Sequence, residues 1–293
     1  MLTTTIDCTS LNKKISTDLP SGLKILFTTM ASVVALKPNV MLPQGPVFIP
    51  HSIFFDFEND FSDKNSTFSN MMNSNENLQI SIRKLGLNLN DEIVVYDDFG
   101  NFCASRVWFM LFSMGFTNVK TLEGGLPLWL EFGFNTQSTT VHPDHVSDVE
   151  LSPSTLHAFV DASYILSTLN NNNQNTQNTQ ILDARSYGRY AGTEPEPRAN
   201  MRSGHIPKSI SMYYTTLLTD GCFKPVNVLS EIFNNKNVQL DNEIITSCGS
   251  GITACILAQA AISLGARSIK VYDASWSQWG ADHSLPIEVV AHD

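Results

Sequence analysis

The sequence has few basic residues and no apolar run of the length that crosses a membrane. Eighteen lysines and arginines against twenty-eight aspartates and glutamates give a formal charge of -10. This balance argues against nucleic acid and against an anionic membrane surface as partners, because both attract basic patches. The apolar stretch from Ile25 to Leu36 is interrupted by threonine and serine and is shorter than the roughly 20 residues that span a bilayer.

Closely spaced cysteines are also missing. The five cysteines are scattered, odd in number and without a CxxC pair, so the pattern predicts neither a disulfide framework nor a metal site, and we expect no cofactor. A reducing compartment fits best. Residues 1–19 contain Asp7 and Asp18 but no arginine, unlike a mitochondrial transit peptide. We therefore expect a cytoplasmic protein, with the mitochondrion as the alternative.

What the sequence does contain is an internal duplication. At an offset of 150 positions, residues 91–129 align without gaps on residues 241–279, with glycine and tryptophan among the identities. Each copy begins with a β-branched run, passes through a glycine-containing loop and a helix, and ends in another short strand. The predicted strands are 93–96, 119–122, 244–246 and 269–272, and the helix of the second copy is predicted over 252–264. This order predicts an α/β fold of two tandem domains, each an open parallel sheet flanked by helices.

Composition suggests where the two domains meet. Residues 139–154 lack periodicity and contain prolines, which indicates a linker between a first domain at 1–138 and a second at 155–293. Residues 170–180 form an asparagine- and glutamine-rich tract that cannot build a core. We interpret that tract as a solvated loop inside the second domain.

The loop that starts at Cys248 is the strongest candidate for chemistry. A free thiol with a pKa of about 8.5 is only a few per cent ionised at neutral pH and needs a stabilised anion. The loop follows a predicted strand, contains Gly249 and Gly251, and runs through Ile252 and Thr253 into a helix. Its backbone amides can converge on the sulfur, or on a persulfide, like an anion nest.

Two side chains of this loop, Ser250 and Thr253, add hydroxyl donors. The alternative to a chemical role is that Cys248 is a small buried residue at a strand end. The glycine-rich curl of the loop disfavours this alternative. Cys255, about two helical turns on, is interpreted as a core residue.

A second charged cluster lies earlier in the second domain. Arg189 and Arg198 stand in a loop rich in glycine and proline and could hold a carboxylate through paired hydrogen bonds. The alternative is that both are surface arginines paired with Glu194 and Glu196.

These motifs resemble the rhodanese superfamily, and most closely its two-domain 3-mercaptopyruvate sulfurtransferases. The loop Cys-Gly-Ser-Gly-Ile-Thr-Ala is similar to their active-site signature, whereas thiosulfate-preferring relatives typically carry basic residues after the cysteine. Further similar segments are 188–198, 204–207 and 272–280 in the second domain and 54–56, 104–108 and 124–126 in the first.

The resemblance implies a ping-pong transfer through a Cys248 persulfide, with release of pyruvate from 3-mercaptopyruvate. Arg189 and Arg198 would hold the substrate, and the loop residues Gly249, Gly251 and Ile252 would contribute to binding it together with Thr253. The acceptors it implies are cyanide, thioredoxin and low-molecular-weight thiols. Thiosulfate is the alternative sulfur donor.

The first domain departs from the family pattern. The resemblance implies a relay from Ser250 to a histidine and an acid, but the histidine position is occupied by Asn70, and the acid maps to Glu58 or to Asp60. An amide cannot shuttle a proton as imidazole does. A non-catalytic scaffold is therefore a further alternative. A phosphatase is disfavoured, because Ala254 stands where that chemistry needs an arginine.

Overall fold

Two five-stranded parallel sheets form the framework of the protein. The computed structural model describes residues 2–17, 19–30, 45–143, 145–170 and 179–290. The first sheet has the order β1 (Thr5–Ile6), β5 (Val119–Leu122), β4 (Glu92–Asp97), β2 (Leu23–Thr28) and β3 (Ser52–Phe54). The second has the order β6 (His157–Val160), β12 (Ser268–Tyr272), β11 (Glu243–Ser247), β7 (Gln180–Asp183) and β8 (Ile210–Ser211).

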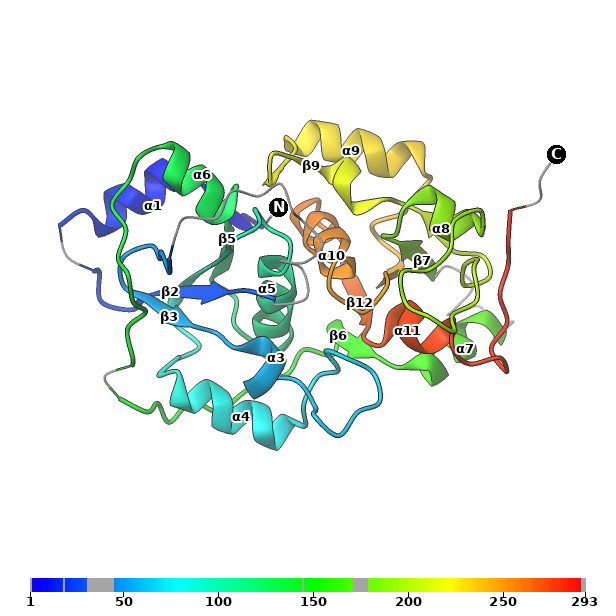
Figure 1. Cartoon of the computed structure of the whole chain (residues 1–293), viewed down its shortest axis with the longest axis horizontal. Coiled ribbons are helices and arrows are strands. Elements are labelled where there is room, and N and C mark those ends of the chain that lie inside the picture. The colour runs from blue at the N-terminus through cyan, green and yellow to red at the C-terminus, as the bar shows by residue number, and fades with distance from the viewer. Residues whose placement is uncertain (1, 18, 31–44, 144, 171–178, 291–293) are drawn as a thin grey trace.

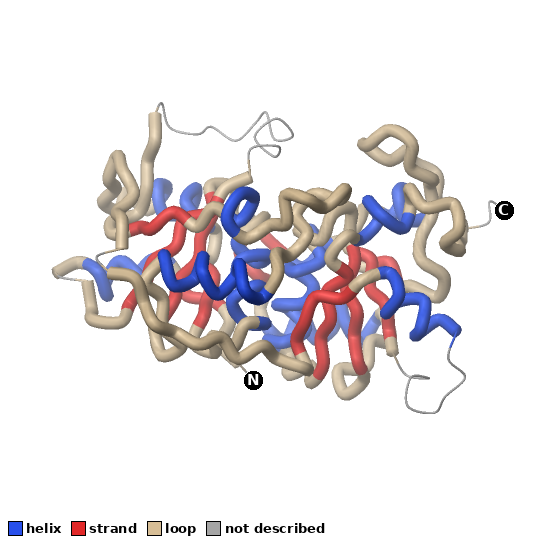
Figure 2. The backbone as a smooth tube through the Cα atoms, turned by 90° about the horizontal axis from the view of Figure 1, so that it is seen from below, coloured by secondary structure: helices blue, strands red, loops and turns tan. Residues whose placement is uncertain are grey.

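Helices cover both sheets, which lie side by side with helices between them (Figures 1 and 2). The helices of the first half are α1 (Cys8–Ile15), α3 (Phe57–Asp60), α4 (Asn75–Lys84), α5 (Ala104–Ser113) and α6 (Gly125–Glu131). Those of the second half are α7 (Ala162–Asn170), α8 (Tyr187–Ala191), α9 (Val226–Asn235), α10 (Ala254–Ser263) and α11 (Ser275–Trp279). A 3-10 turn, η1 (Tyr214–Leu217), leads into an antiparallel hairpin of β9 (Leu218–Thr219) and β10 (Cys222–Phe223). The predicted α/β class with two parallel sheets is confirmed.

The duplication predicted from the sequence extends to backbone conformation. Helices α5 and α10 begin and end at positions exactly 150 apart. Left-handed backbone recurs at the same offset, at Asn101 (φ 61°) and Gly251 (φ 74°) and again at Gly125 (φ 55°) and Ser275 (φ 52°). The loop before each helix therefore curls in the same way in both copies.

The predicted start of the second helix was wrong by two residues. The helix begins at Ala254 rather than at Ile252, because the amides of Cys255 and Ile256 donate to the carbonyls of Ile252 and Thr253 in single tight turns. Ile252 and Thr253 thus belong to the curled loop. The end is close to the expected one, since Leu264 caps the helix and Gly265 turns the chain at a φ of 98°.

The two halves meet along α5 and α10, which face each other in the middle of the molecule (Figure 1). Buried polar groups join them: Ser105 Oγ donates to Gln259 Oε1 at 2.7 Å. Gln259 Nε2 in turn donates to the carbonyl of Thr4 at 3.0 Å and to Thr121 Oγ1 at 2.9 Å. Because a buried amide left without partners is costly, these bonds favour one fixed arrangement of the halves.

Residues 139–154, the predicted linker, run along the first half. The amides of Val141 and Ser152 donate to the carbonyls of Ser52 and Met114 at 2.8 and 3.1 Å. The exact domain boundaries stay a prediction. Most of the low-complexity tract, 171–178, lies outside the described residues. No helix among the described residues is long and apolar enough to cross a membrane.

Candidate active site

Cys248 directly follows β11, at the carboxyl end of the second sheet, and is 2% exposed. Its backbone is held from the turn between β12 and α11. The Cys248 amide donates to Ser275 Oγ at 3.0 Å, and the Cys248 carbonyl accepts the amide of Trp276 at 3.0 Å. The Gly249 carbonyl accepts the amide of Ser277 at 2.9 Å. The start of the loop is therefore fixed before any ligand arrives.

The corresponding loop of the first half shows what this curl can bind. Asp97, which ends β4 and is fully buried, accepts four backbone amides with its carboxylate. The amides of Phe99 and Asn101 donate to Oδ1 at 3.0 and 2.9 Å, and those of Cys103 and Ala104 donate to Oδ2 at 2.7 and 2.8 Å. The curled loop at a helix N-terminus is thus an anion nest, filled here by the chain's own carboxylate.

In the second half the same nest lacks its internal carboxylate. Ser247 takes the place of Asp97, and its buried hydroxyl has no partner in the part of the chain that the structure describes. Within those same residues, the amides of Gly249, Gly251, Thr253 and Ala254 also donate to no protein acceptor. The nest is open to an anion next to Cys248.

Only glycine fits at position 251. Its φ of 74° is left-handed, and an added Cβ would overlap the carbonyl oxygen of Asp273. The tight curl that aims the amides inward therefore depends on this residue.

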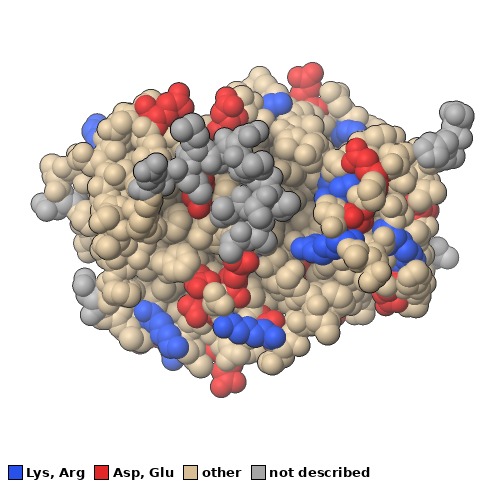
Figure 3. Space-filling model, viewed as in Figure 1, with Lys and Arg blue, Asp and Glu red and all other residues tan. Residues whose placement is uncertain are grey.

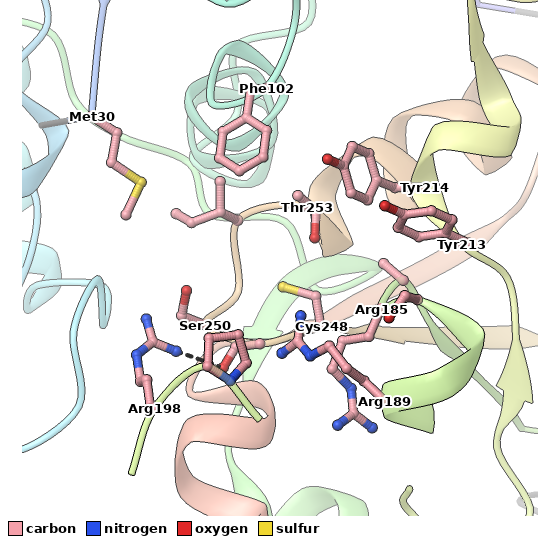
Figure 4. A pocket seen from close by; sticks show the side chains of 15 residues that line it. Met30, Phe102, Arg185, Arg189, Arg198, Tyr213, Tyr214, Cys248, Ser250 and Thr253 are labelled. Atoms are coloured by element: carbon pink, nitrogen blue, oxygen red, sulfur yellow. Dashed lines mark hydrogen bonds between the residues drawn. The ribbon is translucent and has the colours of Figure 1, made fainter. Parts of the chain in front are cut away.

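A cavity of about 600 Å³ lies in front of Cys248 (Figure 4). Arginines lie on one side of the sulfur and the apolar Met30 and Phe102 on the other, while Tyr213 and Tyr214 close the third side. Burial, followed by the nearby Tyr213 and Cys248, raises the pKa of Tyr214 to about 12, so its hydroxyl is a donor at neutral pH. The lining residues are Met30, Phe102, Ala184, Arg185, Ser186, Arg189, Pro197, Arg198, Tyr213, Tyr214, Cys248, Gly249, Ser250, Ile252 and Thr253.

Both predicted arginines reach this cavity. An added Cβ on Gly249 would lie 3.2 Å from Arg189 Nη2 and 3.9 Å from Arg198 Nη1, so the two guanidinium groups converge beside the residue after Cys248. Arg198 Nη1 also donates to the Gly249 carbonyl at 3.4 Å. Arg189 is at the same time paired with Glu196, through Nη2 to Oε2 at 2.5 Å. The two sequence interpretations, substrate anchor and paired arginine, thus both describe part of the geometry of Arg189.

A third arginine, Arg185, also lines the cavity but was not among the predicted site residues. It is buried between Asp183 at 2.5 Å and Glu196 at 2.8 Å, with its guanidinium 4.0 Å from the ring centroid of Trp276. Although burial alone lowers the pKa of Arg185, the two carboxylates raise it above its ordinary value. The sequence signal was the segment Asp183-Ala184-Arg185 at the end of a strand.

Comparison with known proteins assigns the family. Residues 47–132 and 167–282 match the Rhodanese-like domain. The 3-mercaptopyruvate sulfurtransferase of Escherichia coli strain K12 is 34% identical over 269 residues, which cover 92% of this chain and 92% of that protein. The chain belongs to the rhodanese family. The two tandem rhodanese-like domains predicted from the sequence are confirmed.

Other relatives of this rhodanese are also sulfurtransferases. The mitochondrial thiosulfate/3-mercaptopyruvate sulfurtransferase 1 of Arabidopsis thaliana is 34% identical over 263 residues, covering 83% of this chain and 68% of that protein. The crystal structure of SseA, a 3-mercaptopyruvate sulfotransferase from Escherichia coli, superposes with a TM-score of 0.75 at 29% identity. That alignment covers 94% of this chain and 100% of the other.

The relay residues expected from the first rhodanese-like domain do not line the described cavity. Glu58 lies on the short helix α3. Asn70 is buried in a left-handed conformation, and its Nδ2 has no hydrogen-bond partner among the described residues. Ser250 does line the cavity, but no hydrogen bond between described residues links its hydroxyl to Asn70. The roles of Glu58 and Asn70 stay predictions.

The first domain contacts the Cys248 loop through Arg106, which was not among the site residues predicted from the sequence. This fully buried side chain donates to the carbonyls of Gly251 at 3.1 Å and Asn70 at 2.5 Å and pairs with Asp273 at 2.7 Å. Its guanidinium lies 4.1 Å from the ring centroid of Phe159. Arg106 stood in a recognised motif, but no local spacing indicates that it docks behind a loop almost 150 residues away.

The remaining cysteines differ from Cys248 in their surroundings. Cys255 and Cys103 are fully buried, and burial raises the pKa of both thiols. Burial also raises the pKa of the half-buried Cys222. Neither these three nor the buried Cys8 lines the described cavity, so Cys248 is the cysteine that the described cavity contains.

Figure 3 shows the charged side chains on one face of the molecule. On the face shown in Figure 3, leaving aside the residues drawn in grey, basic and acidic side chains are interspersed and no basic area extends across both domains.

Proposed function

We propose that this rhodanese is a 3-mercaptopyruvate sulfurtransferase. The observation that carries the proposal is the open amide nest beside Cys248, whose duplicate in the first domain holds a full carboxylate. Such a nest stabilises a thiolate and equally the negative charge of a persulfide. The names and extent of the relatives support the same activity.

In the proposed first half-reaction, the Cys248 thiolate attacks the sulfur of 3-mercaptopyruvate. The carbon–sulfur bond breaks, its electron pair leaves on the pyruvate enolate, and a proton converts the enolate to pyruvate. Arg189 and Arg198 hold the substrate carboxylate and carbonyl at the position that Gly249 leaves open. Positioning of this kind lowers the barrier by replacing a chance encounter with a fixed geometry.

In the second half-reaction, an acceptor takes the outer sulfur of the persulfide and Cys248 returns to its thiolate. We propose a thiol such as thioredoxin, a low-molecular-weight thiol or cyanide as acceptor. Thiosulfate is kept as a second sulfur donor, because a relative carries that substrate in its name. The compartment stays a prediction, with the cytoplasm favoured and the mitochondrion as the alternative.

The test is a single-turnover assay without acceptor. Mixing the protein with 3-mercaptopyruvate should release one equivalent of pyruvate and add the mass of one sulfur atom to the peptide that contains Cys248. Cys248→Ser should abolish both signals, whereas the control Cys222→Ser, a half-buried thiol outside the cavity, should retain them. Wild-type protein that yields neither pyruvate nor persulfide would overturn the proposal and favour a non-catalytic scaffold.

A further inference from the structure

The charged groups around the cavity are unequal in number. Three arginines line it, at positions 185, 189 and 198. Two carboxylates, Asp183 and Glu196, pair with them. Three positive and two negative charges leave one net positive charge among these described side chains, before the negative charge of the Cys248 thiolate is counted.

Glu196 is the carboxylate that neutralises part of the positive charge next to the proposed substrate position beside Gly249. It accepts three guanidinium hydrogen bonds: from Arg185 Nη1 at 2.8 Å, from Arg189 Nε at 3.1 Å and from Arg189 Nη2 at 2.5 Å. Its side chain is 2% exposed. A buried charge of this kind is poorly screened by salt, so it acts on any ligand bound beside Arg189.

We propose that Glu196 is a specificity-determining residue that selects a monoanionic sulfur donor over a dianionic one. This inference rests on the proposed sulfurtransferase function. Mercaptopyruvate carries one carboxylate charge, and each negative charge at the cavity, that of Glu196 included, opposes a dianion more strongly than a monoanion. Thiosulfate carries two, and its second charge finds no unneutralised guanidinium, because Glu196 takes part of Arg185 and two nitrogens of Arg189.

Glu196 also fixes how Arg189 faces the ligand. Because Nε and Nη2 are engaged by the carboxylate, the guanidinium is held in one orientation beside Gly249. Glu196 is therefore a positioning residue as well as a charge, and the experiment must separate the two effects.

The test measures kcat/KM for 3-mercaptopyruvate and for thiosulfate in wild type, Glu196→Gln and Glu196→Asp. Glutamine keeps the size and one acceptor oxygen but removes the charge, so the ratio of the two kcat/KM values should shift toward thiosulfate by about tenfold. A tenfold change corresponds to about 1.4 kcal/mol, the order of magnitude expected for one poorly screened unit charge near the ligand. The shift should arise mainly in the KM for thiosulfate, since uniform binding of an anion changes KM rather than kcat.

Glu196→Asp keeps the charge and should keep the wild-type preference. Glu194→Gln is the matched control: Glu194 lies in the same loop and is exposed, and its carboxylate accepts from Ser186 Oγ at 3.1 Å rather than from an arginine. Its removal should change the ratio by less than about twofold, because an exposed charge is screened. A purely structural role for Glu196 would lower both kcat/KM values by the same factor and overturn the proposal, and so would an unchanged ratio in Glu196→Gln.

A second measurement keeps this inference separate from the proposed function. Inorganic sulfate and pyruvate are unreactive dianionic and monoanionic probes whose dissociation constants can be measured by calorimetry without turnover. Glu196→Gln should tighten sulfate relative to pyruvate by about the same tenfold. If wild type turned over neither sulfur donor, the function would fail while this binding ratio still decided the role of Glu196.

Discussion

Replacing Ser247 by aspartate should fill the amide nest beside Cys248 with a carboxylate, as Asp97 fills the nest of the first domain. In the first domain the carboxylate of Asp97 accepts four amides at 2.7 to 3.0 Å. A carboxylate at position 247 would meet the equivalent amides of the second loop, in the residue directly before Cys248. Two unit charges about 5 Å apart repel by roughly 3 kcal/mol at an effective dielectric constant of about 20, which corresponds to a factor of about a hundred in the rate of a step that needs the sulfur anion.

We therefore expect Ser247→Asp to slow persulfide formation by at least about a hundredfold. The rate would be followed by rapid-quench mass spectrometry of the Cys248 peptide, with urea unfolding as the measure of folding. The free energy of unfolding should not fall, because the carboxylate gains amide donors. Ser247→Asn is the control of equal size without charge and should lose much less rate. A Ser247→Asp protein that formed persulfide at nearly the wild-type rate would refute the view that these amides stabilise the negative charge on the Cys248 sulfur.

Four further outcomes follow from the contacts described above. Asp97→Asn should lower the free energy of unfolding by about 3 kcal/mol, because amides lose a charged acceptor; a loss under about 1 kcal/mol in urea titrations would contradict it. Gly251→Ala should cost about 2 to 4 kcal/mol, from left-handed strain and from overlap with Asp273, and should fail to accumulate persulfide even where it folds. Arg106→Leu should cost about 3 to 5 kcal/mol by leaving the buried Asp273 unpaired, and an additional Asp273→Asn should recover part of that loss in the same unfolding assay. Iodoacetamide at pH 7 should leave Cys8 unmodified in peptide maps, since burial raises the pKa of Cys8 to about 12 and only the thiolate reacts; early labelling of Cys8 would be the contrary result.

The parts predictable from the sequence are those that local patterns determine. Beta-branched runs placed the central strands β4 and β11, and the duplication placed the loop and helix after each of them. The convergence of Arg189 and Arg198 on the cavity was also predictable, because their loop and the Cys248 loop both follow strands of one parallel sheet, whose carboxyl ends share an edge. The two-residue error at the start of the second helix also has a local cause, because the residues that form the tight turns at Ile252 and Thr253 look like the first helical residues in the sequence.

The parts that could not be predicted depend on packing between distant segments. The docking of Arg106 against Gly251 needs the face-to-face arrangement of α5 and α10, which no spacing within either copy indicates. Pairing of Arg189 with Glu196 was one of the two sequence interpretations, but the additional pairing of Glu196 with the buried Arg185 depends on how the irregular loop folds, which its spacing does not indicate. The filled nest of the first domain had a sequence signal, because the duplication aligns Asp97 with Ser247, but an aspartate at the end of a strand does not by itself indicate that four backbone amides surround it.

The proposed reaction needs a stabilised sulfur anion at Cys248 and a proton for the leaving enolate. Different groups can meet these two needs, and the structure shows the groups for the first need more clearly than those for the second. The loop around Asp97 shows that the curled backbone alone holds a fully buried carboxylate, without a lysine, an arginine or a histidine among the four donors. We infer that the equivalent loop can hold a thiolate or a persulfide without an imidazole, so we expect Asn70 not to weaken the proposed nucleophile. What an imidazole would add is a proton for the departing enolate, and that step has other donors in reach of the cavity, among them the hydroxyls of Ser250 and Tyr214. The first domain holds the Cys248 loop through Arg106 and lines the cavity with the apolar Met30 and Phe102. We therefore expect its departures at the predicted relay positions to slow proton transfer rather than sulfur transfer.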